Sequence, residues 1–200
     1  MTKEVGFLGK PGTKEQIKTP SVVSRLSAEV RARVERVKFV VFDVDGVLTD
    51  GRLFYHDDGT ESKAFDVRDG HGIKMLMHAG IETALVSGRN SPMVEKRAAD
   101  LGIKEVVQGV RDKVPIIEEI ISKRGLKLEE VAVVGDDVVD LPAMSRVGLA
   151  VAVADASEHL FDSAHYITLA PGGRGVAREV AELILGVQGL WEKVASPYFE

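Results

Sequence analysis

Asp43 and Asp45 stand two residues apart, directly after an apolar run, and their types and spacing point to phosphorus chemistry. The run 37–42 predicts a buried strand, which places both carboxylates at the rim of a sheet. Carboxylates this close raise one another's pKa unless a cation neutralises them, and Mg²⁺ is a hard cation that binds carboxylate and carbonyl oxygens. With Mg²⁺ bound, one carboxylate could attack phosphorus while the other transfers a proton. The competing interpretation is a common Asx-rich turn after a strand.

Two further polar sites follow in the chain, Ser87-Gly88 after a predicted strand and Lys113 at the start of a predicted helix. Ser87 and Gly88 follow the run 81–86, where a hydroxyl and a backbone N–H at the opening of a helix offer donors for phosphate oxygens. A plain turn is the competing interpretation for this pair. Lys113 lies just inside the next predicted helix, where its charge opposes the helix dipole. Such a local conflict hints at function, whereas a solvated surface lysine is the alternative.

A third acidic group comes late in the chain. Gly135-Asp136-Asp137 follows the apolar run 131–134, and Asp140 lies one helical turn beyond Asp136. Acids at a helix start either cap the helix and match its dipole or bind a metal ion. Their spacing alone leaves both interpretations open.

The elements that must position these residues alternate regularly. Short apolar runs predict strands, and patterns with helical spacing lie between them. This alternation predicts an α/β fold with a doubly wound parallel sheet, whose ligands bind beyond the carboxyl ends of the strands. The predicted strands span 37–42, 82–86, 105–107, 131–134, 148–151 and 166–168, and the predicted helices lie within 27–37, 91–101, 114–121 and 176–187, with another starting near Asp69.

One segment breaks the alternation. Residues 52–56 and 62–66 flank Asp57-Asp58-Gly59-Thr60, which predicts a β-hairpin with Asp-Gly at its turn. A lone two-stranded ribbon is marginal in water, so we expect the hairpin to pair with other chains in an oligomer. Only about two dozen residues separate Thr49 from Ile73, too few for a separate lid domain. We therefore expect a loose N-terminal arm over 1–24 and a single capless domain over 25–200.

Composition restricts the class of protein. The chain has 200 residues, 44% apolar and 28% charged, which is typical of a globular protein with a full core. A net charge of −5 gives no basic footprint for nucleic acid, and the lack of cysteine excludes disulfides and thiolate zinc sites. The N-terminus lacks the apolar core of a secretory signal, and no apolar stretch is long enough to cross a membrane. We expect a cytoplasmic protein.

Taken in order, the four short motifs resemble those of the haloacid dehalogenase-like (HAD) phosphohydrolase superfamily, over about residues 37–189. The resemblance implies that Asp43 is a nucleophile that forms an aspartyl-phosphate, and that Asp45 acts as general acid and then base. It implies that Ser87 and Lys113 hold the phosphoryl group. Mg²⁺ would then bind Asp43, the Asp45 carbonyl and Asp136, with Asp137 or Asp140 in support.

A closer resemblance rests on five longer motifs, at residues 49–52, 63–72, 134–137, 151–156 and 172–179. These motifs resemble those of the 3-deoxy-D-manno-octulosonate 8-phosphate (KDO 8-phosphate) phosphatases. That family is capless and tetrameric, and hairpins of neighbouring chains close each active site. The resemblance implies a homotetramer that hydrolyses KDO 8-phosphate with Mg²⁺ in lipopolysaccharide biosynthesis.

Six residues are candidates to bind the rest of the substrate. Lys63, Arg68 and Arg89 are candidates for the sugar carboxylate or its hydroxyls, with exposed strand cations as the competing interpretation. The loop 172–175 lacks side-chain bulk, so Gly173 can approach a ligand by its backbone, unless the loop is only a flexible entry to the last helix. The remaining two candidates are Thr49 and Gly88.

Other functions fit parts of the pattern. A phosphatase for a nine-carbon sugar acid, such as KDN 9-phosphate or sialic acid 9-phosphate, would meet the same carboxylate and terminal phosphate. A response-regulator receiver is disfavoured because its acid pair precedes the phosphorylated aspartate by a whole β-α-β unit, whereas Asp43 and Asp45 come together. A non-catalytic binding protein is disfavoured because every catalytic position is filled.

Overall fold

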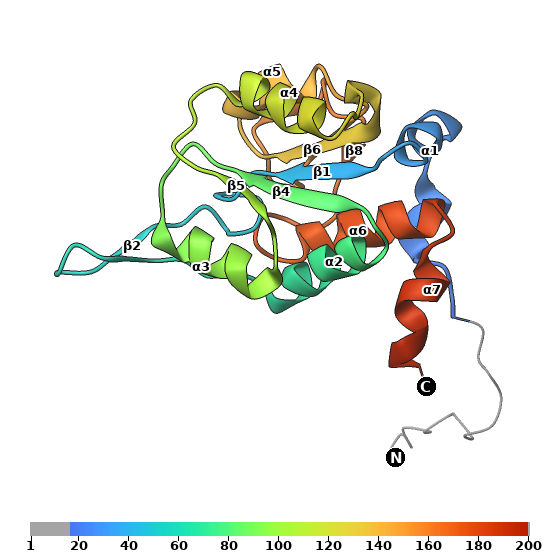
Figure 1. Ribbon diagram of the computed structural model, residues 1–200, viewed down its shortest axis with the longest axis horizontal. Coiled ribbons are helices and arrows are strands. Elements are labelled where there is room, and N and C mark those ends of the chain that lie inside the picture. The colour runs from blue at the N-terminus through green and yellow to red at the C-terminus, as the bar shows by residue number, and fades with distance from the viewer. Residues whose placement is uncertain (1–16, 200) are drawn as a thin grey trace, which may run out of the picture.

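The computed structural model describes residues 17–199, and its centre is a six-stranded parallel sheet (Figure 1). The central strand β1 is apolar throughout and buried along its whole length, as a strand covered on both faces requires. The order across the sheet is β5-β4-β1-β6-β7-β8, and every pairing is parallel. The strands are β1 (Phe39–Phe42), β4 (Glu82–Val86), β5 (Glu105–Val107), β6 (Val131–Gly135), β7 (Leu149–Ala152) and β8 (Tyr166–Ile167).

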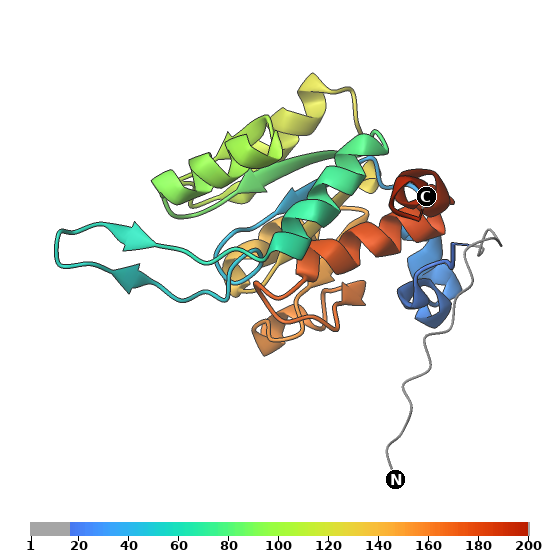
Figure 2. The same ribbon diagram turned by 90° about the horizontal axis from the view of Figure 1, so that it is seen from below.

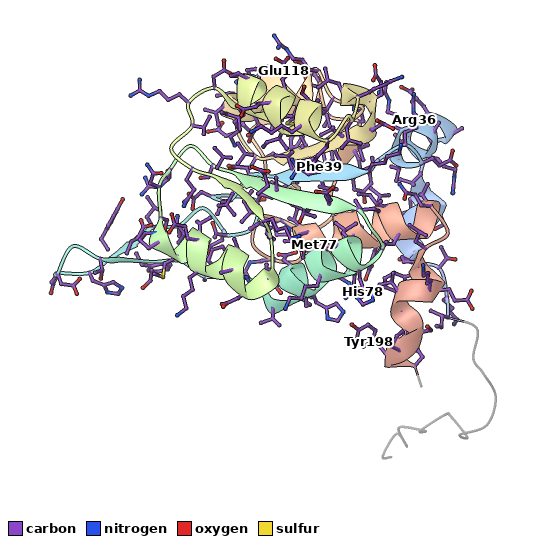
Figure 3. All side chains as sticks on the ribbon, in the orientation of Figure 1. Arg36, Phe39, Met77, His78, Glu118 and Tyr198 are labelled. Atoms are coloured by element: carbon purple, nitrogen blue, oxygen red, sulfur yellow. The ribbon has the colours of Figure 1, made fainter. Side chains whose placement is uncertain are left out.

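Helices cover both faces of the sheet, which confirms the predicted doubly wound α/β fold (Figure 1). Two apolar clusters form, one on each side. Phe39 points into the cluster beneath α4 and α5, and Figure 3 shows it at the level of the sheet while Glu118 lies on the outer side of α4. Phe42 belongs to the other cluster. The helices are α2 (Val67–His78), α3 (Pro92–Leu101) and α6 (Val176–Val187) on one face, α4 (Lys113–Lys123) and α5 (Leu141–Met144) on the other, and α7 (Trp191–Ala195) near the C-terminus.

The predicted hairpin is present but shorter than expected. Its strands are β2 (Phe54–Tyr55) and β3 (Glu61–Ser62) instead of 52–56 and 62–66, and Figure 2 shows it extending away from the sheet. The second strand ends early because Asp66 caps α2, its carboxylate accepting a hydrogen bond from the Arg68 N–H at 2.7 Å. Between β1 and α2 this hairpin is the only regular structure, so no cap domain is inserted there.

The N-terminal prediction needs a correction. Residues 1–16 lie outside the described part of the chain, but Ser21–Arg25 form a 3₁₀ helix, η1, within the arm that we expected to be loose. Val22 and Val23 are buried in the same cluster as α6, and this apolar contact holds the segment in place. The helix expected within 27–37 is α1 (Ala28–Val34), which the Ser27 side chain caps.

Element ends otherwise differ from the predictions by one or two residues. Strand β1 starts at Phe39 instead of Val37, β7 covers 149–152, and β8 ends at Ile167. No helix in residues 17–199 has the length and apolarity needed to cross a membrane. The remaining short 3₁₀ helices are η2 (Leu128–Glu130), η3 (Val138–Asp140), η4 (Glu158–Leu160) and η5 (Ser196–Tyr198).

Candidate active site

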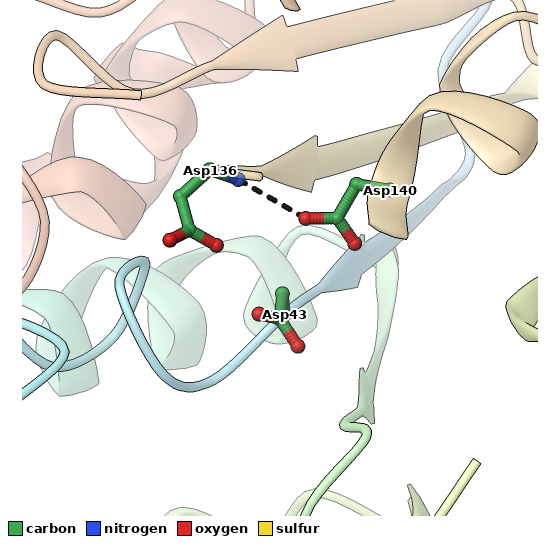
Figure 4. A group of neighbouring side chains, drawn as sticks. All are labelled: Asp43, Asp136 and Asp140. Carbon is green, nitrogen blue, oxygen red and sulfur yellow. Dashed lines mark hydrogen bonds between the residues drawn. The ribbon is translucent and has the colours of Figure 1, made fainter. Parts of the chain in front are cut away.

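Three carboxylates meet at the carboxyl edge of the sheet. Asp43 follows β1 and Asp136 follows β6, and because these strands are parallel neighbours, their ends bring the two side chains together. Asp140, at the end of η3, completes the group (Figure 4). Each of the three offers a carboxylate oxygen, and these oxygens all lie within 4.8 Å of one another. The cluster is the arrangement that a hard divalent cation binds.

The electrostatics of the cluster indicate that a cation belongs in it. Burial raises the pKa of Asp43 to about 6, and Asp140 contributes to this rise. Burial raises the pKa of Asp136 to about 8, with the charges of Asp43, Asp140 and Asp137 adding to it. A buried cluster in which the ionisation of Asp43 and Asp136 is disfavoured, and which offers only oxygen donors, fits Mg²⁺.

Asp137 and Asp140 lie in different surroundings. The Asp140 carboxylate is buried and accepts the Asp136 backbone N–H at 3.1 Å, which is the dashed line in Figure 4. Asp137 is exposed, and its side chain accepts the N–H of Val138 at 2.7 Å. Asp140 therefore belongs to the cluster, whereas Asp137 is a helix cap.

Lys113 is buried and lies against the acidic cluster. Its ammonium donates to Asp43 Oδ1 at 2.7 Å and to Asp140 Oδ1 at 2.6 Å. Burial acts to lower the pKa of Lys113, but the two carboxylates outweigh burial, and the pKa lies above its usual value. The alternative of a solvated surface lysine is wrong. The ammonium is held where it can offset negative charge beside Asp43.

Asp45 points to a different set of partners, all of them cations. The Lys63 ammonium donates to Asp45 Oδ1, and the Lys63 side chain is fully buried. Arg89 Nε lies 3.8 Å from Asp45 Oδ2, and the Arg89 side chain is 44% exposed. Asp45 Oδ2 is buried without a hydrogen-bond partner among the described residues. That oxygen remains available to a ligand, as a group that transfers protons requires.

The loop after β1 depends on close backbone packing. Gly46 has a φ of 90°, and any side chain there would overlap the Asp136 carboxylate. The Thr49 hydroxyl is buried and accepts the N–H of Gly51 at 3.2 Å, so it organises the loop. Gly173 donates its N–H to the Val47 carbonyl at 2.9 Å, which packs the glycine-rich loop against the acidic one. Roles of Thr49 and Gly173 in binding substrate stay predictions.

The remaining candidates divide into two groups. Ser87 is buried at the end of β4, next to the exposed Gly88, and its Oγ accepts the Arg89 N–H at 3.2 Å. Arg68 does not join Asp45. Its exposed guanidinium bonds Asp66 at 3.0 Å and the Arg174 carbonyl at 3.2 Å.

Two residues that the sequence analysis missed face Arg89. Arg89 Nη2 lies 3.3 Å from the Tyr55 hydroxyl and 3.4 Å from Glu61 Oε2, both on the hairpin. The sequence could have indicated Glu61. Residues two apart lie on the same face of a strand, so this spacing places Glu61 on the same face as Lys63, which was already a candidate.

This arrangement is that of a haloacid dehalogenase-like hydrolase. The carboxyl edge of its parallel sheet holds a candidate acidic nucleophile, a buried lysine and a second pair of acids. Residues 103–180 match the haloacid dehalogenase-like hydrolase family. Within this class, the chain belongs to the KDO 8-phosphate phosphatase family, as the following relative shows. The chain is 45% identical over 164 residues to the *Escherichia coli* K12 KDO 8-phosphate phosphatase KdsC, covering 82% of this chain and 87% of that protein.

Solved structures agree with this assignment. A probable YrbI family phosphatase from *Pseudomonas syringae* pv. phaseolica 1448a is 48% identical, with a TM-score of 0.85 over 87% of this chain and 99% of that one. The KDO 8-phosphate phosphatase of *Moraxella catarrhalis*, crystallised with magnesium, phosphate and KDO, is 38% identical. Its TM-score is 0.83, over 85% of this chain and 98% of that one.

Proposed function

We propose that this protein is a Mg²⁺-dependent phosphatase that hydrolyses KDO 8-phosphate to KDO and inorganic phosphate. The observation that carries the proposal is the buried cluster of Asp43, Asp136 and Asp140 with Lys113 beside it. Relatives named for this reaction, one of them holding magnesium, phosphate and KDO, support it.

Mg²⁺ would be held by Asp43, Asp136 and the Asp45 carbonyl, with Asp140 at its side. When bound, it would neutralise the carboxylates and the phosphate oxygens, so that two anions can approach. Lys113 contributes a second positive charge at Asp43. The charge of the transferred group is spread over its oxygens, so positioning and electrostatics provide most of the acceleration.

The reaction then takes two steps on this chain's own side chains. An Asp43 oxygen attacks phosphorus, the bond from phosphorus to the sugar oxygen breaks, and Asp45 gives its proton to that oxygen. Asp45 next takes a proton from water, the water oxygen attacks phosphorus, and the bond from phosphorus to Asp43 breaks. Asp45 Oδ2 has no hydrogen-bond partner among residues 17–199, which supports this role because the oxygen can then bond the leaving oxygen and later the water.

Substrate specificity is assigned to the cations near Asp45. A KDO 8-phosphate molecule carries a carboxylate, and a guanidinium donates strong charge-assisted hydrogen bonds to a carboxylate. Arg89 is half exposed beside Asp45 and fits this role. Lys63 instead holds Asp45, since its buried ammonium already bonds that side chain.

An assay of phosphate release tests the proposal. We expect Mg²⁺-dependent release from KDO 8-phosphate with a kcat/KM at least about tenfold above that for KDN 9-phosphate or sialic acid 9-phosphate, because a longer sugar would shift the carboxylate relative to Arg89 when the phosphate is held at Asp43. Steady-state kinetics on the three sugar-acid phosphates and on p-nitrophenyl phosphate measure this. A preference for a 9-phosphate would support the nine-carbon alternative, and no release from any of the four would overturn a phosphatase.

We also propose a homotetramer in which hairpins of neighbouring chains cover the sites. Phe54 is 50% and Tyr55 67% exposed on a ribbon that extends from the domain (Figure 2), and such apolar exposure favours burial against another chain.

We expect light scattering after size exclusion to give about four times 21.6 kDa, and Phe54→Asp to lower that mass because it places a charge in the interface. The matched control is Leu169→Asp, which charges another exposed apolar side chain outside the hairpin and should retain the tetramer. A wild-type particle of 21.6 kDa would contradict the shared site.

A further inference from the structure

Glu61 lies on the hairpin with one carboxylate oxygen directed at Arg89. Its Oε2 is 3.4 Å from Arg89 Nη2, and the Glu61 side chain is only 15% exposed. The same Arg89 nitrogen lies 3.3 Å from the Tyr55 hydroxyl, on the other strand of the hairpin. Tyr55 on β2 and Glu61 on β3 are directly opposite each other in the hairpin, so both contacts come from one cross-strand pair. The hairpin therefore holds the Arg89 side chain from both of its strands.

Glu61 also lies near Ser91, the residue that precedes α3. Glu61 Oε1 and the Ser91 hydroxyl are both buried with no hydrogen bond of ordinary geometry among the described residues. The Ser91 hydroxyl is close enough to lower the pKa of Glu61, and Lys63 and Arg89 lower it further, so Glu61 is a carboxylate at neutral pH. The Ser91 N–H is fixed separately by Gln108 Oε1 at 2.9 Å. Glu61 thus interacts with both Arg89 and Ser91, the first and last residues of the segment 89–91.

The guanidinium of Arg89 is only partly used by these contacts. Nη2 contacts the hairpin and Nε faces Asp45 at 3.8 Å, while Nη1 has no partner within residues 17–199. A long cationic side chain that is 44% exposed would otherwise sample many rotamers, and ordering it on binding would cost affinity. An acidic partner that fixes Nη2 holds the guanidinium plane in place and leaves Nη1 as the donor for a ligand.

We propose that Glu61 is a positioning residue for substrate specificity, which holds Arg89 beside Asp45 so that the free side of the guanidinium receives the substrate's carboxylate. This inference rests on the proposed function, because it requires a sugar phosphate that also carries a carboxylate. Glu61 itself does not touch the substrate. Its effect should appear with a carboxylated substrate and be small with a phosphate ester that lacks this group.

Glu61→Gln tests the inference, since it keeps the shape and removes the charge. We expect the ratio of kcat/KM for KDO 8-phosphate to kcat/KM for p-nitrophenyl phosphate to fall about tenfold, because the ion pair with Arg89 is replaced by a weaker hydrogen bond from a neutral amide. The change should be a rise in KM for KDO 8-phosphate, with kcat within about twofold of wild type. The control Asp57→Asn removes the same charge from an exposed position of the same hairpin and should keep the ratio.

A double-mutant cycle separates positioning from structure. If Glu61 acts through Arg89, Glu61→Gln should add little to the loss already caused by Arg89→Met. Equal losses on both substrates would show a general structural role and overturn the inference, as would an unchanged ratio or a variant with an altered oligomer mass. A wild-type enzyme inactive on KDO 8-phosphate overturns the proposed function itself, which is a different result from an active enzyme that is indifferent to Glu61→Gln.

Discussion

The Asp43→Asn variant should lose at least about a thousandfold in kcat, the scale on which removal of a nucleophile acts. The amide has the shape of the carboxylate but scarcely attacks phosphorus. The fold should persist, because Lys113 keeps its bond to Asp140 at 2.6 Å and the substitution removes one acid from a crowded acidic cluster. Kinetics with KDO 8-phosphate measure the loss, and circular dichroism with a thermal melt measures the fold.

The control for this variant is Asp100→Asn, which removes the same charge from an exposed position on α3 and should leave kcat within about twofold. An Asp43→Asn enzyme that retained a tenth of the wild-type rate would contradict covalent catalysis. Mass spectrometry of the wild type, quenched during turnover, should find one phosphoryl group on Asp43.

Removal of Mg²⁺ by a chelator should abolish turnover to a similar degree, and addition of excess Mg²⁺ should restore it. Without a cation, Asp43 and the phosphate ester repel one another, and Lys113 alone offsets only part of that charge. The measurement is phosphate release before and after dialysis against the chelator. Full activity in metal-free buffer would overturn the assignment of the acidic cluster.

The affinity for Mg²⁺ should increase with pH, because Asp136 must lose a proton before it can bind the ion. Burial holds the pKa of Asp136 at about 8 in the metal-free protein, so near pH 7 Mg²⁺ must displace a proton. Apparent affinity should therefore rise from pH 6 to pH 8, by up to about tenfold per unit, and level off above pH 8. Calorimetric titration at several pH values measures this, and a constant affinity from pH 6 to pH 8 would contradict it.

Stability follows the same linkage. The pKa of Asp136 rises from 3.8 to about 8 on folding, so the folded state binds more protons than the unfolded chain within that window. The metal-free protein should lose stability as pH rises through the window, because an unfavourable charge forms inside the fold. The increase in Tm on adding Mg²⁺ should consequently be larger at pH 8 than at pH 6.

The order of elements and the acids at the strand ends could be predicted from the sequence. Apolar runs such as 37–42 mark strands locally, and parallel strands end at the same edge of a sheet, where ligands bind. That Asp43 and Asp136 share a metal ion was implied only by the resemblance. Element ends were less exact. The arm was predicted to be loose through residue 24, since a five-residue segment shows no period. Tertiary contacts hold Val22 and Val23, through their packing against α6 and the hydrogen bond from Arg31 to the Val23 carbonyl.

The pairing of the charged side chains could not be predicted from the sequence and is seen only in the folded structure. Lys113 meets Asp43 across 70 positions of the chain and is buried there, although its local sequence is equally typical of a surface lysine. Lys63 donates a hydrogen bond to Asp45, whereas Arg68 donates one to Asp66 and not to Asp45. The sequence by itself determined which chemistry could occur at the sheet edge, because strand periodicity is local. Ion pairing depends on distances between segments remote in the chain, and only the packed fold sets those distances.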